Sequence, residues 1–113
     1  MLGEFMGYRK PTASEHRLLA FLAEKVPELV ADWVEDVLVR DHDDGGMGSL
    51  DLWLPSRSSL PRSLGKTVAE YRFKDEDGVD VLVALNLDQN CVPYELDIWK
   101  VDFSPLIRIP EEF

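Results

Sequence analysis

The stretch KTVAEYRFKDEDGVDVLVALNL, residues 66–87, alternates two sets of side chains on either side of an acidic turn. A period of two is that of a β-strand whose two faces meet different surroundings, and DEDG (75–78) supplies residues that hairpin turns favour. The segment PYELDIWKV (93–101) follows a second turn, DQN (88–90), and alternates in the same way. These residues predict three consecutive antiparallel strands.

Two shorter strand-like segments precede them, DVLVRD (36–41) and SLDLWL (49–54). They are separated by HDDGGMG (42–48), whose glycines can adopt positive φ in a turn. PSRSSLPRSLG (55–65) is rich in serine and proline, which predicts a loop. The whole strand region therefore comprises about five antiparallel strands.

One amphipathic helix is predicted over TASEHRLLAFLAEKV (12–26). Thr12 followed three residues later by Glu15 is a capping box, and the apolar residues after it recur at helical spacing. Pro27 ends the helix, and the segment ELVADW (28–33) can add another turn.

These elements predict an α+β fold: an N-terminal amphipathic helix packed on one face of a roughly five-stranded antiparallel meander sheet. We expect a single domain over residues 1–113, with residues 1–10 as a flexible arm. The side of the sheet that faces the helix should bury the following residues: Tyr71, Phe73, Val79, Val81, Val83, Leu85, Leu96 and Ile98.

The other face of the sheet is expected to meet solvent, as is common for antiparallel sheets. Period-two counting assigns nine residues to it: Val68, Glu70, Arg72, Asp80, Leu82, Ala84, Glu95, Asp97 and Trp99. By the same counting Thr67 belongs to the helix side. We expect a partner-binding surface of acidic side chains and one tryptophan, formed by Glu70, Asp80, Glu95, Asp97 and Trp99.

The surroundings of Trp99 remain open between two interpretations. It can be an exposed docking anchor, or the apolar tail of the chain can cover it. Pro105 ends the ladder of the last strand, so a turn is expected at residues 102–105. The tail LIRIP (106–110) should then lie back along the body and bury Leu106 and Ile107.

The charge balance limits the choice of partners. The chain has 22 acidic and 12 basic residues among 113, a formal net charge of −10. Such a chain repels nucleic acids and anionic membranes and attracts basic proteins, although acidic surfaces also serve solubility alone. No apolar segment is long enough to span a membrane, and a single cysteine, Cys91, excludes an internal disulfide. A cytoplasmic location is the simplest expectation.

The sequence contains no catalytic constellation, and we expect no cofactor, no resident metal and no enzymatic activity. The segment LGKT (64–67) lacks the preceding glycine of a phosphate-binding loop. The alternative is a small-ligand site or a minor active site in the acidic loop 41–48, for which the candidate residues are Asp41, His42, Asp43, Asp44 and Cys91. Aspartate and glycine are also what a solvated hairpin loop contains.

Several segments resemble a family of small bacterial proteins known as a domain of unknown function: RKPT (9–12), DDGGMGSL (43–50), YRFKDEDG (71–78) and ELDIWKVDFSPLIRIP (95–110). The resemblance extends from about Arg9 to Pro110 and implies no catalytic residues. In size and acidity the chain is also similar to immunity proteins that neutralise bacterial toxins. A non-enzymatic protein-binding module with a basic partner, such as a toxin domain, is therefore our leading expectation.

Overall fold

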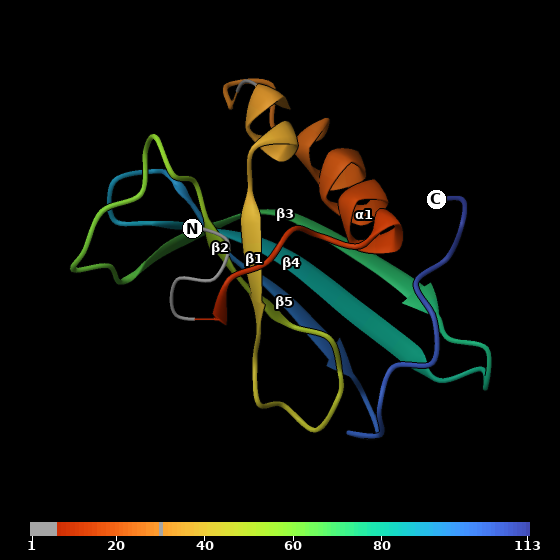
Figure 1. The fold of residues 1–113 in the computed structure, drawn as a ribbon. Helices are drawn as coiled ribbons and strands as arrows, with labels where there is room; N and C mark the ends of the chain where they lie inside the picture. Colours follow the sequence, from red (N-terminus) through yellow and green to blue (C-terminus); the bar gives the residue numbers. More distant parts are fainter. Residues whose placement is uncertain (1–6, 30) are drawn as a thin grey trace.

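The fold is seen in a computed structural model, which describes residues 7–29 and 31–113. Within these residues the elements follow the order α1 (Ala13–Ala23), the short 3-10 helix η2 (Ala31–Glu35), and the strands β1 (Leu38–Asp41), β2 (Leu50–Trp53), β3 (Leu64–Lys74), β4 (Asp80–Asp88) and β5 (Pro93–Lys100). The helix α1 lies over one face of the sheet (Figure 1). The predicted α+β class, with one helix against a five-stranded antiparallel sheet, is confirmed.

The order of the strands in the sheet is β1-β2-β5-β4-β3. The predicted meander is therefore wrong at one step, because β2 pairs with β5 through Leu50↔Leu96 and Asp51↔Glu95 and not with β3. Short turns keep β3, β4 and β5 adjacent, as Figure 1 shows. The long connection 54–63 lets the β1–β2 hairpin attach to the free edge of β5 instead.

Helix α1 forms where its capping box predicts. The Glu15 amide donates to Thr12 Oγ1, and the Thr12 amide donates back to Glu15 Oε1 at 2.8 Å. The helix then buries Leu18, Leu19 and Leu22 completely, which stabilises the fold by about 1.5–3 kcal/mol for each side chain. It ends earlier than expected, at Ala23, and residues 25 and 26 continue in tighter i→i−3 bonds before the proline.

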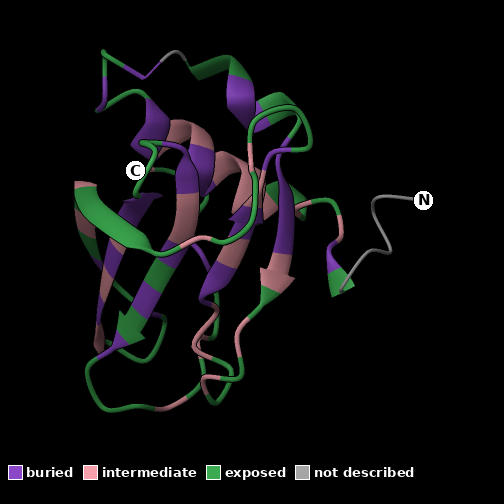
Figure 2. Ribbon diagram, turned by 90° about the vertical axis from the view of Figure 1, so that its left-hand side faces the viewer, coloured by how far each residue is buried: buried purple, intermediate pink, exposed green. Residues whose placement is uncertain are grey.

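The alternation of buried and exposed residues along the strands is visible in Figure 2. Six of the eight predicted core residues are buried on the helix side, namely Phe73, Val81, Val83, Leu85, Leu96 and Ile98, while Tyr71 and Val79 are half-buried. Two face assignments are wrong, because a bulge lies between Thr67 and Ala69 in the pairing with β4. Thr67 faces outward and Val68 packs against the core, since an extra residue reverses the alternation.

At the N-terminus, residues 1–6 of the expected flexible arm lie outside the described residues. Tyr8 is buried, and Arg9 exchanges two backbone hydrogen bonds with Val39 of β1. The Arg9 guanidinium also binds Glu15 and Asp41. This part of the chain is thus attached to both the helix and the sheet.

The C-terminal tail is fastened by a buried ion pair. Lys100 Nζ lies 2.9 Å from Asp75 Oδ2 and 2.7 Å from Asp77 Oδ2, and the side chains of Lys100 and Asp75 are 1% and 0% exposed. The amides of Ile107 and Arg108 donate to the Asp75 carboxylate. We call this arrangement of Asp75, Lys100 and the two tail amides the tail lock.

The tail does lie back along the body (Figure 1), where Phe113 stacks on Phe21 of α1 at 4.7 Å. The prediction that Ile107 is buried is wrong, since 54% of this residue is exposed. Leu106 is half-buried, and Ile109 is the tail residue that enters the core. The reason is the tail lock, which holds the Ile107 and Arg108 amides toward Asp75 and leaves the Ile107 side chain in solvent.

We expect the free energy of unfolding to fall as the pH is lowered from about 5 towards 2. Burial acts to raise the pKa of Asp75, but the bonds from the tail amides and Lys100 outweigh it and hold this pKa below its usual value. The pKa values of Glu15, Asp44 and Asp51 are lowered as well. A lowered pKa in the folded state contributes stability above the unfolded-state pKa of about 4, and this stability is lost as the pH falls through the folded-state pKa.

Urea titrations at a series of pH values measure this loss. The Asp75→Asn variant is the control, because without the carboxyl group at this position its stability should depend less steeply on pH. A free energy of unfolding that stays constant over this range would contradict the prediction.

Candidate functional site

The sheet face directed away from α1, here called the outer face, carries a continuous row of polar side chains. One residue of each strand contributes to it in register, and this polar row consists of Arg40, Asp51, Glu95, Asn86 and Thr67. Asn86 Nδ2 donates to Glu95 Oε1 at 2.9 Å, and Thr67 Oγ1 donates to Asn86 Oδ1 at 2.6 Å. Arg40 pairs with Asp51 at the other end of the row. Hydrogen bonds between cross-strand neighbours therefore orient both ends of the row.

His42, immediately after β1, extends toward the middle of the polar row. Its Nε2 atom lies 2.7 Å from Asp51 Oδ1 and 3.9 Å from Glu95 Oε2. Burial acts to raise the pKa of Asp51, but the hydrogen bonds from Arg40 and His42 lower it overall. The result is one imidazole beside two carboxylates, of which Asp51 is held in its ionised form.

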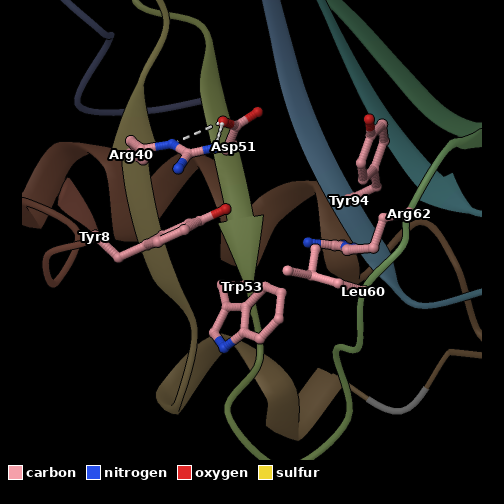
Figure 3. A pocket seen from close by; sticks show the side chains of 7 residues that line it. All are labelled: Tyr8, Arg40, Asp51, Trp53, Leu60, Arg62 and Tyr94. Atoms are coloured by element: carbon pink, nitrogen blue, oxygen red, sulfur yellow. Dashed lines mark hydrogen bonds and ion pairs between the residues drawn. The ribbon is translucent and has the colours of Figure 1, made fainter. Parts of the chain in front are cut away.

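A hollow of about 220 Å³ lies beside the polar row (Figure 3), lined by Tyr8, Arg40, Asp51, Trp53, Leu60, Arg62 and Tyr94. The Arg62 guanidinium lies against the rings of Trp53 and Tyr94, 5.4 and 4.8 Å from their centres. It also binds Asp88, Leu52 O and Pro93 O. Because these bonds engage all three guanidinium nitrogens, Arg62 holds the wall of the hollow together.

An apolar patch lies where β5 ends, formed by Leu82, Trp99, Val101 and Phe103. Trp99 is 41% exposed and Phe103 68% exposed, and their ring centres lie 6.0 Å apart. Leu82 is directly opposite Trp99 in the β4–β5 pairing. Phe103 has a φ of +65°, an unusual conformation for a bulky residue. The turn therefore presents a large aromatic ring to solvent at a conformational cost.

The five residues predicted to bind a partner occupy three parts of the outer face. Glu70 and Asp97 lie on either side of Ala84 of the intervening strand β4. Trp99 lies two residues beyond Asp97 along β5, on the same face of the sheet. Glu95 belongs to the polar row. Asp80 is paired with Lys74 at 2.9 Å, near the end of the β3–β4 hairpin. The structure thus brings Glu70, Asp97 and Trp99 together but engages Glu95 and Asp80 in other contacts.

The candidate side chains of the acidic loop do not converge on one site. Asp41 binds Arg9, Asp43 is exposed, and Asp44 accepts the amides of Met47 and Ser49 and so closes the loop. Cys91 belongs to the turn between β4 and β5, and Figure 1 shows this turn well away from the loop between β1 and β2. Among the residues that the structure describes, His42 is the one candidate that lies beside other potential metal ligands, and these come from β2 and β5.

Sequence reasoning missed the polar row and the tail lock. Asn86 is the polar interruption in the apolar segment VALNL (83–87), and that signal could have marked it. Nothing comparable marks Arg62 or Lys100, because arginine and lysine are ordinary surface residues. Their burial depends on carboxylates that lie 23 or more residues away along the chain.

The fold and the outer face define a small α+β domain. Helix α1 covers one face of an antiparallel sheet whose strand order, β1-β2-β5-β4-β3, differs from the order along the chain. A family model described as a domain of unknown function, DUF6984, matches residues 8–110. The chain belongs to this family. No curated protein and no solved structure matches the sequence of this chain. Within the described residues, the helices are too short or too polar to cross a membrane.

Proposed function

We propose that this protein is a non-enzymatic binding module that docks a basic protein partner on the outer face, as a toxin-neutralising immunity protein would. The observation that carries this proposal is the exposed pair Trp99 and Phe103, in an apolar patch beside exposed carboxylates. Large aromatic side chains at the centre of an interface contribute a disproportionate share of binding energy.

The charges around the patch support a basic partner. Glu70, Asp97 and Asp102 are exposed, and within residues 7–29 and 31–113 they form no salt bridge. Asp97 accepts a hydrogen bond from Ser49 and Asp102 from Ser104, and these partners are uncharged, so the negative charges are not neutralised. The net charge of −10 adds a long-range attraction. Complementary charge raises the rate of association and does so more strongly at low ionic strength. A nuclease toxin domain, which has to bind polyanions, has the basic surface that fits this description.

We expect Trp99→Ala to weaken binding of the partner by about 2 kcal/mol or more while leaving the fold intact. Because 41% of Trp99 is exposed, the space left by the indole opens to solvent and is not an enclosed cavity. The partner is captured from a host lysate at low salt, identified by mass spectrometry, and its affinity for the purified variants is then measured by calorimetry. The matched control is Leu64→Ala, another exposed apolar residue, at the start of β3 and outside the patch.

Support requires a basic partner whose affinity falls with added salt, falls in Trp99→Ala and is unchanged in Leu64→Ala. Equal affinity of the wild-type protein and Trp99→Ala would contradict the docking role of the patch. So would a large drop in the thermal midpoint of Trp99→Ala, because the side chain would then be part of the core.

A further inference from the structure

We propose that His42, Asp51 and Glu95 bind a divalent transition-metal ion, with Zn²⁺ as the best-fitting candidate. One nitrogen or oxygen atom from each side chain can be chosen so that all three lie within 4.8 Å of one another. The three residues come from the end of β1, from β2 and from β5, so the bound ion would join three neighbouring strands on the outer face. This site is separate from the apolar patch, and the inference does not depend on the docking proposal.

The two carboxylates are oriented for such an ion by groups behind them. Asp51 Oδ2 is held by Arg40, which leaves Oδ1 directed at His42 Nε2. Glu95 Oε1 is held by Asn86, and its Oε2 lies on the side of His42. Metal-binding carboxylates are commonly held by hydrogen bonds of this kind, which reduce the cost of arranging the ligands.

Partial burial distinguishes this cluster from ordinary surface acids. The side chains of His42, Asp51 and Glu95 are only 30%, 25% and 21% exposed. The His42 backbone amide is bonded to Ser49 O at 3.0 Å, which fixes the start of the loop. The ligands therefore lose little further conformational freedom when an ion binds.

The donor set determines the class of metal. One imidazole nitrogen and two carboxylate oxygens suit borderline ions such as Zn²⁺, whereas Ca²⁺ prefers six to eight oxygens. Metal–ligand bonds of about 2.0–2.2 Å place two donors of a tetrahedral site about 3.3–3.6 Å apart. The observed separations of 2.7 and 3.9 Å from His42 Nε2 lie on either side of this value, so the side chains have to shift and the ion replaces the hydrogen bond between His42 and Asp51. Three protein ligands leave a fourth tetrahedral position for water or for a group of a bound molecule. That position would lie close to the hollow, because Asp51 also lines the hollow.

The test is a titration of the untagged full-length protein with Zn²⁺, followed by calorimetry, and with Co²⁺, followed by visible absorption. The variant His42→Gln can still donate a hydrogen bond to Asp51 but is a poor metal ligand. The matched control is His16→Gln, the other histidine, which contacts the exposed Glu35. A second control is Cys91→Ser, which removes the exposed thiol.

We expect one zinc ion to bind per chain. With Co²⁺, the visible absorption should be as intense as that of a four-coordinate ion. Affinity should fall by about tenfold or more in His42→Gln and in Glu95→Gln and stay unchanged in both controls. Circular dichroism and thermal melts establish that each variant is folded.

Two results would overturn the inference. The first is the absence of saturable binding up to about 1 mM zinc. The second is binding that survives in folded His42→Gln or that disappears in His16→Gln or Cys91→Ser, since the ion would then lie elsewhere.

Discussion

Asp75→Ala is expected to lower the free energy of unfolding by about 3–5 kcal/mol, the usual cost of removing one partner of a buried ion pair. The substitution leaves the Lys100 ammonium group buried with Asp77 and Pro105 O as its remaining partners. It also leaves the amides of Ile107 and Arg108 without their acceptor. Urea titration followed by tryptophan fluorescence measures the loss.

Two companion variants separate the contributions. Lys100→Met removes the charge but keeps an apolar stem, and Asp75 would still accept the amides of Glu76, Ile107 and Arg108. Its destabilisation should therefore be smaller than that of Asp75→Ala. Lys74→Met breaks only the exposed pair with Asp80 and should leave the thermal midpoint nearly unchanged. Equal effects of Asp75→Ala and Lys74→Met would show that the tail lock contributes little.

Arg62→Ala is expected to have a comparable effect, also about 3–5 kcal/mol, because it leaves Asp88 as a buried carboxylate without its cation. The side chains of Arg62 and Asp88 are 5% and 2% exposed. The guanidinium further satisfies the carbonyl oxygens of Leu52 and Pro93 and thereby fastens the 54–63 connection to β2 and β5. A thermal melt followed by circular dichroism measures the change.

Arg62→Lys tests whether charge alone is sufficient. Lysine keeps the positive charge but lacks the planar fork that reaches Asp88 and two carbonyl groups at once, so its stability should be intermediate. Arg57→Ala, in the same connection but exposed, is the control and should leave the midpoint close to that of the wild type. A melt of Arg62→Ala that coincides with that of Arg57→Ala would contradict the anchoring role.

The positions of the helix and of the five strands could be predicted from the sequence because local signals determine them. Thr12 and Glu15 cap the helix through atoms only three residues apart. The apolar alternation of residues 79–87 predicts which side chains of β4 face the core, since successive side chains of a strand point to opposite faces. The same counting correctly assigned Trp99 and Leu82 to the outer face, where the structure places them opposite each other in the β4–β5 pairing.

The candidate site was only partly predictable. His42 and Trp99 were predicted as site residues from the sequence, but His42 was expected to act together with the carboxylates of its own loop. Its observed partners, Asp51 and Glu95, belong to strands that meet only because β2 pairs with β5. That pairing depends on a long connection, and no local period specifies which strand edge such a connection will reach.

The sequence by itself therefore determined the elements, their order along the chain and most of the inward-facing residues, since hydrophobic periodicity and capping act over a few residues. Only the tertiary structure decided the strand order, the bulge at Thr67 and the burial of Lys100 beside Asp75. The physical reason is that charged groups become buried only where a distant partner offsets the loss of hydration. The local sequence around a charged residue does not identify such a distant partner, because folding alone brings the two together.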